Sequence, residues 1–205
     1  MTIDLTEEQK IKLLNSDDVY IVMRDILLRG EKIDQEKEHF WMIGLANNNE
    51  ILYIELVSLG SVRATTVEPM NVYRVAVLKG AVKVIFVHNH PSGELKPSES
   101  DKDVTDRLIQ VGRILGIEAL DHLIISTKSY MSFVDAGLFQ QLQQSTKWVP
   151  LYEIKERMLA EQKRIREQAV VDERKLMAKK LKVKNMPVDF IIEVTGFSED
   201  EIKKI

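Results

Sequence analysis

The chain has 205 residues, of which 44% are hydrophobic and 30% charged, a composition that supports a folded core and argues against global disorder. It contains no cysteine, which excludes disulfides, thiolate metal sites and a thiol nucleophile among its residues. The charged N-terminus lacks the pattern of a secretory signal, and no apolar run is long enough to span a bilayer. We therefore expect a cytoplasmic protein without a membrane segment.

Helical signals dominate the first part of the chain. Thr6 precedes a run of Glu and Gln residues and predicts an N-cap, and the run Ser16-Asp17-Asp18 predicts a second one. The apolar residues that follow recur at helical spacing as far as Gly30. These patterns predict an N-terminal helical segment over residues 1–30.

The middle of the chain alternates between strand and helix patterns. Two β-prone apolar runs, residues 39–46 and 51–60, flank an asparagine cluster and predict a β-hairpin. Residues 68–80 predict a helix, with Pro69 tolerated in its first turn. Residues 81–88 (AVKVIFVH) are almost continuously apolar and β-branched, which predicts a buried strand.

A loop with Pro91, Gly93 and Pro97 follows that strand, and a helix is expected from about Ser98 to Ile117. Two more strands are expected over residues 120–126 and 130–133. This order of elements predicts an α/β or α+β domain, a mixed sheet flanked by helices, which we assign to residues 31–145.

The character of the chain changes after Pro150. Residues 151–184 contain neither glycine nor proline and predict one long charged helix. Two short helices should follow: one bounded by Pro187 and Gly196, the other opened by a capping box of Ser198 and Glu201. We expect residues 151–205 to form a charged helical extension that ends in a helical hairpin.

The residues that carry chemistry lie around the loop after the buried strand. His88 and His90 stand two residues apart on extended backbone, so both rings can point to one side, and Asp101 follows in the first turn of a helix. Two imidazoles and one carboxylate, with the fourth position open, are the ligands expected of a catalytic zinc. The alternatives are a structural histidine pair, and an Asp101 that only complements the helix dipole.

The spacing HxHx7SxxD, filled by His88, His90, Ser98 and Asp101, resembles the JAMM motif of the MPN-domain metallohydrolases. The longer string HNHPSGELKPSESD, followed by VTDRL and ILGIEALDHLII, is similar to the bacterial RadC branch of that family. The resemblance covers about residues 17–135 and implies an MPN/JAB-like fold for the domain.

The resemblance also implies roles for individual residues. His88, His90 and Asp101 would bind Zn²⁺, Glu38 would activate the metal-bound water, and the hydroxyl of Ser98 would hold the oxyanion. Glu55, on the partner strand of the hairpin, is the rival of Glu38 for the proton-transfer role. Ser98 also has a local explanation, because serine is a favoured helix N-cap.

The implied reaction is the hydrolysis of an amide bond in a peptide or isopeptide substrate. The RadC branch also carries a DNA-repair label, so a nucleic-acid-associated factor is one alternative and a non-catalytic MPN scaffold is another. The remaining histidines are expected to be structural: His122 in the core or beside a ligand, and His39 on the opposite face from Glu38. Asn89 and Ser92 are expected only to order the loop.

Residues 155–184 hold 11 Lys and Arg against 5 Asp and Glu. We interpret this stretch as a solvated amphipathic helix that packs on the domain or on a second copy, which would make a homo-oligomer. Contact with nucleic-acid phosphates is the alternative, although the lack of aromatic residues between Tyr152 and Phe190 argues against stacking on single strands. The terminal hairpin is interpreted as an interaction or oligomerisation module.

Overall fold

The structure is a computed structural model that describes residues 2–3, 12–59 and 67–204. The contacts divide the chain into two compact units, residues 1–148 and 149–205. The N-cap predicted at Thr6 lies outside the described residues. Within the described part of the chain, no helix combines the length and the apolar character needed to cross a bilayer.

A six-stranded mixed sheet, in the order β1-β3-β2-β4-β5-β6, is the centre of the first unit. Strands β4 and β5 run parallel, and the other neighbouring strands are antiparallel. The strands are β1 (Thr2–Ile3), β2 (His39–Leu45), β3 (Ile51–Leu59), β4 (Lys83–Asn89), β5 (Glu118–Ile125) and β6 (Tyr130–Ser132). The predicted mixed sheet and the β2–β3 hairpin are therefore confirmed.

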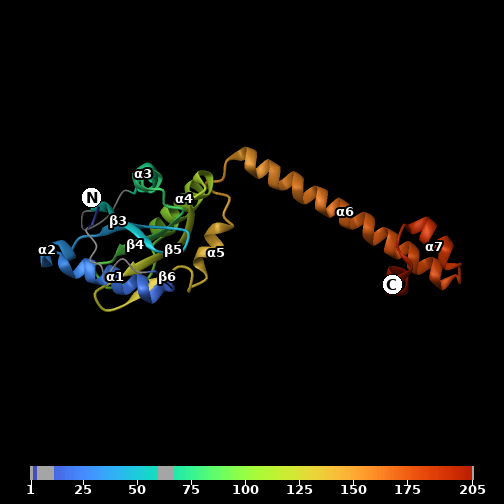
Figure 1. Cartoon of the computed structure of the whole chain (residues 1–205), viewed down its shortest axis with the longest axis horizontal. Coiled ribbons are helices and arrows are strands. Elements are labelled where there is room, and N and C mark those ends of the chain that lie inside the picture. Colours follow the sequence, from blue (N-terminus) through green and yellow to red (C-terminus); the bar gives the residue numbers. More distant parts are fainter. Residues whose placement is uncertain (1, 4–11, 60–66, 205) are drawn as a thin grey trace. The chain divides into compact units, whose positions relative to one another are not determined.

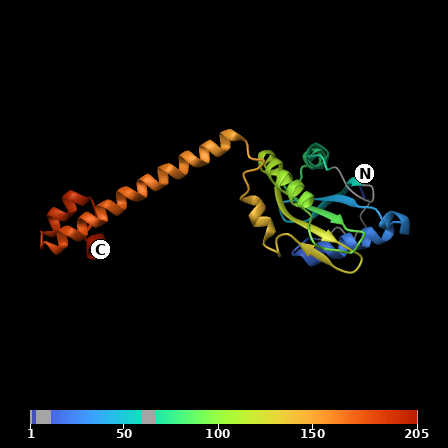
Figure 2. The same ribbon diagram turned by 180° about the vertical axis from the view of Figure 1, so that it is seen from behind.

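Helices cover both faces of this sheet. Helix α1 (Ser16–Arg29) lies on one face, and α3 (Pro69–Lys79) and α4 (Glu99–Leu115) lie on the other (Figures 1 and 2). The short helices are α2 (Lys32–Gln35), in the connector before β2, and α5 (Leu138–Gln143), which packs beside α4. Neither short helix was predicted, because a single turn or two gives no clear apolar periodicity.

The alternation of side chains along β4 decides which face carries the histidines. Successive side chains of a strand point to opposite faces of the sheet. Val84 and Phe86 belong to the core under α3 and α4, whereas Ile85 and Val87 belong to the core under α1. His88 continues the first series, so its ring faces α4.

The start of α1 differs from the prediction by one residue. The helix begins at Ser16, but its N-cap is Asn15, whose side-chain oxygen accepts a hydrogen bond of 2.9 Å from the N–H of Asp18. Asp18 in turn accepts a hydrogen bond of 2.8 Å from the N–H of Leu14. Asparagine caps helices as well as serine does, and the carboxylate of Asp18, which accepts from the residue just before the cap, helps to hold the chain there.

The described residues of the second unit form three helices. These are α6 (Leu151–Val183), α7 (Val188–Thr195) and α8 (Glu199–Lys204). Ala178, Ile191 and Ile202 form its small buried core. Ser198 and Glu201 make the predicted capping box: the N–H of Ser198 donates to the carboxylate of Glu201 at 2.8 Å.

Candidate metal centre

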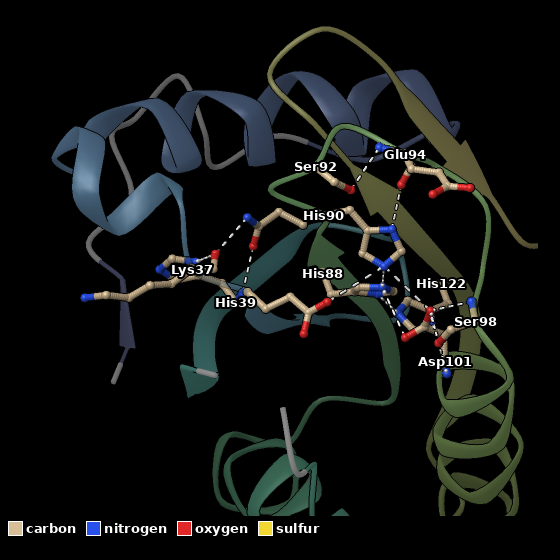
Figure 3. A network of polar contacts seen from close by, with 11 residues as sticks. Lys37, His39, His88, His90, Ser92, Glu94, Ser98, Asp101 and His122 are labelled. Carbon is tan, nitrogen blue, oxygen red and sulfur yellow. Dashed lines mark hydrogen bonds and ion pairs between the residues drawn. The ribbon is translucent and has the colours of Figure 1, made fainter. Parts of the chain in front are cut away.

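The two histidines of the motif converge at the C-terminal end of β4. His88 is the penultimate residue of the strand and His90 follows its last residue, so both rings reach the same side (Figure 3). Their Nε2 atoms lie 3.0 Å apart. The side chain of His88 is 6% exposed and that of His90 is 13% exposed, so the pair lies at the edge of the core with His90 nearer to solvent.

The first turn of α4 places Asp101 against this pair. Ser98 is the N-cap of α4, and its hydroxyl oxygen accepts a hydrogen bond of 3.1 Å from the N–H of Asp101. One carboxylate oxygen of Asp101, Oδ1, lies 3.4 Å from Nε2 of His88, and the other lies 3.6 Å from Nε2 of His90. The capping box therefore aims the carboxylate at the two imidazoles.

The donor set fits a tetrahedral metal ion. One donor atom from each of His88, His90 and Asp101 can be chosen so that all three lie within 4.8 Å of one another. Ligands at the usual zinc bond lengths occupy tetrahedron corners separated by roughly 3.3 Å. The nearest distances between these side chains, 3.0, 3.4 and 3.6 Å, bracket that separation. These three residues could hold a metal ion.

Burial and charge leave the two imidazoles in different states. Burial lowers the pKa of His88 to about 4, so this ring is neutral at physiological pH. The carboxylate of Asp101 raises the pKa of His90 against the opposing effect of burial. Burial disfavours the ionised form of Asp101, but His90, His88 and Ser98 outweigh it, and the pKa of Asp101 is lowered.

The structure brings Glu38 to this site. In the pairing of β2 with β4, Phe40 lies opposite His88, so the antiparallel register directs the chain at Glu38 towards His90. Oε1 of Glu38 lies 4.0 Å from Nε2 of His90, and its side chain is 28% exposed. A carboxylate beside the donor set and open to solvent is suited to accept and return protons.

Glu55 lies elsewhere in the sheet. It is a residue of β3, opposite Met42, and β2 separates β3 from β4. Two strand spacings amount to about 10 Å. The register therefore brings Glu38, rather than its rival Glu55, beside the histidines.

Asn89, for which the sequence indicated no role beyond ordering its own loop, holds the backbone around Glu38. Its side-chain oxygen accepts a hydrogen bond of 2.7 Å from the N–H of His39, and its side-chain nitrogen donates to the carbonyl of Lys37 at 3.0 Å. These two backbone groups flank Glu38 on either side. Asn89 itself is 1% exposed, so a single buried amide fixes this segment.

His88 and His90 each make a further contact through the other ring nitrogen. Nδ1 of His90 lies 2.6 Å from the carbonyl oxygen of Glu94, and Nδ1 of His88 lies 2.8 Å from Nε2 of His122 (Figure 3). Nδ1 of His122 lies 2.6 Å from the hydroxyl of Thr105. The sequence did not single out Thr105, although its position four residues after Asp101 puts both on one face of α4.

The other predicted residues lie as follows. His39 stacks on Trp41, with 4.9 Å between ring centroids, on the α1 side of the sheet, which agrees with its expected structural role. The hydroxyl of Ser98 donates to the carboxylate of Asp101 at 2.7 Å. Ser92 orders its own loop by accepting a hydrogen bond from the N–H of Glu94. Whether Ser98 also holds an oxyanion stays a prediction.

Comparison with known proteins gives one family. The family model described as a RadC-like JAB domain matches residues 13–138. Relatives named UPF0758 proteins include one from Methanosarcina acetivorans, 42% identical over 131 residues, which are 64% of this chain and 55% of the relative. A relative from Geobacillus kaustophilus is 46% identical over 101 residues, 49% of this chain and 45% of the relative. The chain thus spans about half the length of the curated relatives it matches, and their names state no activity.

Proposed function

Because the chain belongs to the family of RadC-like JAB domains, we propose that it is a zinc-dependent hydrolase of amide bonds in peptides or isopeptides. The observation that carries the proposal is the convergence of the Nε2 atoms of His88 and His90, 3.0 Å apart, with the carboxylate of Asp101. Zinc at these three ligands would supply a Lewis acid that activates water and polarises a carbonyl group.

Glu38 is the proton-transfer group of this proposal. Its Oε1 atom, 4.0 Å from Nε2 of His90, takes a proton from the attacking water and delivers it to the nitrogen of the departing amine. The buried amide of Asn89 keeps the backbone on both sides of Glu38 in place, which limits the positions that the carboxylate can adopt.

A cleft beside the centre offers room for the substrate. It has a volume of about 470 Å³ and is lined by His90, by the loop over residues 91–93, by the turn over residues 126–129, and by Leu27 and Gln35 on the α1 side; Glu38, His88 and Asp101 do not line it. Its size falls within the range of ligand-binding pockets, and it opens directly beside one proposed ligand. We propose that a part of the substrate that flanks the scissile amide, rather than the amide itself, lies in this cleft.

Two measurements test the proposal. Elemental analysis of untagged protein should find about one zinc per chain, lost in the double variant His88→Ala/His90→Ala. Mass spectrometry of a linear peptide library and a lysine-isopeptide library should then reveal cleavage that Glu38→Gln reduces by about 10²–10⁴-fold, with zinc retained. Glu55→Gln is the matched control and should cleave like the wild type. A protein that binds no zinc and cleaves neither library would favour a non-catalytic scaffold, whereas cleavage that survives Glu38→Gln would contradict the role of Glu38.

As a second candidate function, we propose that α6 contacts nucleic-acid phosphates. Residues 174–184 carry six Lys and Arg side chains and no acidic one, and most of them are exposed. Helix α8 begins with three acidic residues, 199–201, which would repel phosphates, so the contacts would be made by α6.

Binding of the full chain to a random-sequence DNA duplex, measured over a series of salt concentrations, tests this candidate. Lys179→Gln/Lys180→Gln should weaken binding and reduce the salt slope by about one for each phosphate contact removed. Arg157→Gln/Lys163→Gln, which replaces two side chains already paired with glutamates on the same helix, is the control. Binding that does not depend on salt would contradict this candidate.

A further inference from the structure

We infer that Thr105 and His122 are positioning residues, which fix the ring nitrogen of His88 that carries the proton and so present the other nitrogen to a metal ion. The inference rests on the proposed metal site and goes beyond it, because it assigns a role to two buried residues that are not ligands. Both are fully buried, with 0% exposure.

The chain of hydrogen bonds begins at the backbone of α4. The hydroxyl of Thr105 contacts the carbonyl oxygen of Asp101, one helical turn earlier, at 2.5 Å. A carbonyl oxygen only accepts hydrogen bonds, so at this separation the hydroxyl proton of Thr105 must point at it. Such a bond to the carbonyl four residues earlier is common for threonine in helices, and it leaves the lone pairs of the hydroxyl free to accept.

The ring of His122 contacts these lone pairs of the Thr105 hydroxyl. Its Nδ1 atom lies 2.6 Å from the hydroxyl oxygen of Thr105, whose only proton is already directed at Asp101. Nδ1 must therefore be the donor. The ring is fully buried, and its two nitrogens contact a hydroxyl and another imidazole rather than a carboxylate, so a charge on it would be uncompensated. In the neutral ring, the Nε2 atom is left without a proton and can only accept.

The proton on the ring of His88 is placed by its contact with His122. Nδ1 of His88 lies 2.8 Å from this accepting Nε2 atom of His122, so Nδ1 carries the proton of the neutral His88 ring. Nε2 of His88 then has a free lone pair, and it is the atom that lies 3.0 Å from Nε2 of His90 and 3.4 Å from the carboxylate of Asp101. In the opposite tautomer, two unprotonated nitrogens would face each other across 2.8 Å.

A single hydrogen bond to the backbone orients the ring of His90. Its Nδ1 atom donates to the carbonyl of Glu94, so Nε2 is the atom that would give up its proton to bind a metal ion. A surface loop therefore orients the ring of His90, and two buried side chains orient the ring of His88. Metal-binding histidines depend on such partners for ring orientation and basicity.

The chain of hydrogen bonds also connects two elements that carry ligands. Asp101 and Thr105 belong to α4, His122 to β5 and His88 to β4. A helix that supplies the third ligand thus also supplies the hydroxyl that orients the first. Movement of α4 away from the sheet would disturb both ligands together.

Nitrogen-15 NMR of the imidazole rings in the full-length wild type tests the inference directly, in the zinc-free and the zinc-loaded protein. We expect Nδ1 of His88 and Nδ1 of His122 to carry protons in both. A spectrum in which Nδ1 of His88 is unprotonated would overturn the inference. If the protein bound no zinc, the proposed function would fail, whereas the zinc-free spectrum would still decide the tautomer.

Zinc affinity, measured by competition with a chelator, tests the consequence. Thr105→Val removes the accepting hydroxyl at nearly constant volume and should weaken zinc binding by about 10–100-fold. Thr105→Ser keeps the hydroxyl and should bind zinc with the affinity of the wild type. A folded Thr105→Val protein with wild-type zinc affinity would contradict the inference. If this variant does not fold, the protonation of Nδ1 in the wild-type spectrum alone decides for or against the inference.

Two more variants separate orientation of the ring from packing. His122→Phe should also weaken zinc binding, and adding Thr105→Val to it should weaken binding no further, because Thr105 acts only through His122. Phe133→Leu is the packing control, since the Phe133 ring lies 4.8 Å from the His122 ring but outside the chain of hydrogen bonds. It should lower thermal stability and leave zinc affinity close to that of the wild type. Additive losses in the double variant would contradict the inference.

Discussion

The side-chain oxygen of Asn89 accepts a hydrogen bond of 2.7 Å from the backbone N–H of His39, across 50 residues of sequence. The same amide donates to the carbonyl of Lys37. Asn89 stands between the two proposed histidine ligands, and the bonds hold the segment that carries Glu38. Strand β4, with the first proposed ligand, and the proposed proton-transfer group are therefore connected by one side chain.

Asn89→Ala should lower the free energy of unfolding by about 1–3 kcal/mol, because it removes the partner of the N–H of His39 and one of two contacts of the carbonyl of Lys37, which also lies 2.9 Å from Nδ1 of His39. Urea denaturation measures this loss. Asn48→Ala is the matched control: the Asn48 side chain accepts one exposed hydrogen bond in the turn before β3, and its removal should change stability by no more than about 0.5 kcal/mol. Equal effects of the two substitutions would contradict the role of Asn89.

Two roles are predicted for Ser98, the N-cap of α4 and the hydroxyl that holds an oxyanion, and different substitutions separate them. Ser98→Ala removes the N-cap of α4 and should destabilise the protein by about 1 kcal/mol. Ser98→Asn keeps a strong N-cap without the hydroxyl, so stability should hold while turnover falls by about 10²–10³-fold. Thermal unfolding and peptide cleavage measure the two effects. Wild-type turnover in Ser98→Asn would show that the hydroxyl serves only as a cap.

Tyr73 makes stability depend on pH in the alkaline range. Burial is the main cause that raises the pKa of its phenol above the ordinary value, and the hydroxyl donates to the carbonyl of Leu108 at 2.8 Å. Below pH 10 the phenol is neutral in both states and its contribution is complete. As the pH rises above about 10, the unfolded chain releases the proton but the folded protein does not, so stability falls.

Tyr73→Phe should therefore cost about 0.5–1.5 kcal/mol at neutral pH and make the alkaline loss of stability less steep. Urea denaturation at a series of pH values measures both effects. Tyr53→Phe is the comparison, because the buried hydroxyl of Tyr53 has no hydrogen-bond partner among the described residues and its removal should cost less at neutral pH. An unchanged alkaline slope in Tyr73→Phe would contradict this assignment.

Gly112 permits the close approach of α4 to its neighbours. A Cβ atom at this position would lie 2.4 Å from the hydroxyl of Tyr73 and 2.6 Å from the backbone oxygen of Ile117. Gly112→Ala should lower the free energy of unfolding by about 1–3 kcal/mol, because the backbone has to shift. Ile114→Ala, on the same helix but 59% exposed, should change it by about 0.5 kcal/mol or less. A Gly112→Ala protein as stable as the wild type would contradict the close packing.

The sequence alone determined those features that depend on neighbours along the chain. Helix caps, apolar periodicity and the asparagine turn act over a few residues, and they predicted the hairpin, the strand ending near His88 and the long helices. The spacing of His88, His90 and Asp101 identified the candidate ligand set for the same reason, since a strand end, a loop and a helix start lie consecutively in the chain.

Only the tertiary structure decided which residues distant in sequence lie beside His88, His90 and Asp101. Glu38 precedes the first strand of the hairpin, and Glu55 lies within the second. The order of strands in the sheet, with β2 next to β4, brings Glu38 to His90. The contacts of Asn89 with His39 and of His88 with His122 span 50 and 34 residues. Local patterns do not encode strand pairing at such separations, because the pairing is selected by burial of whole faces of the sheet.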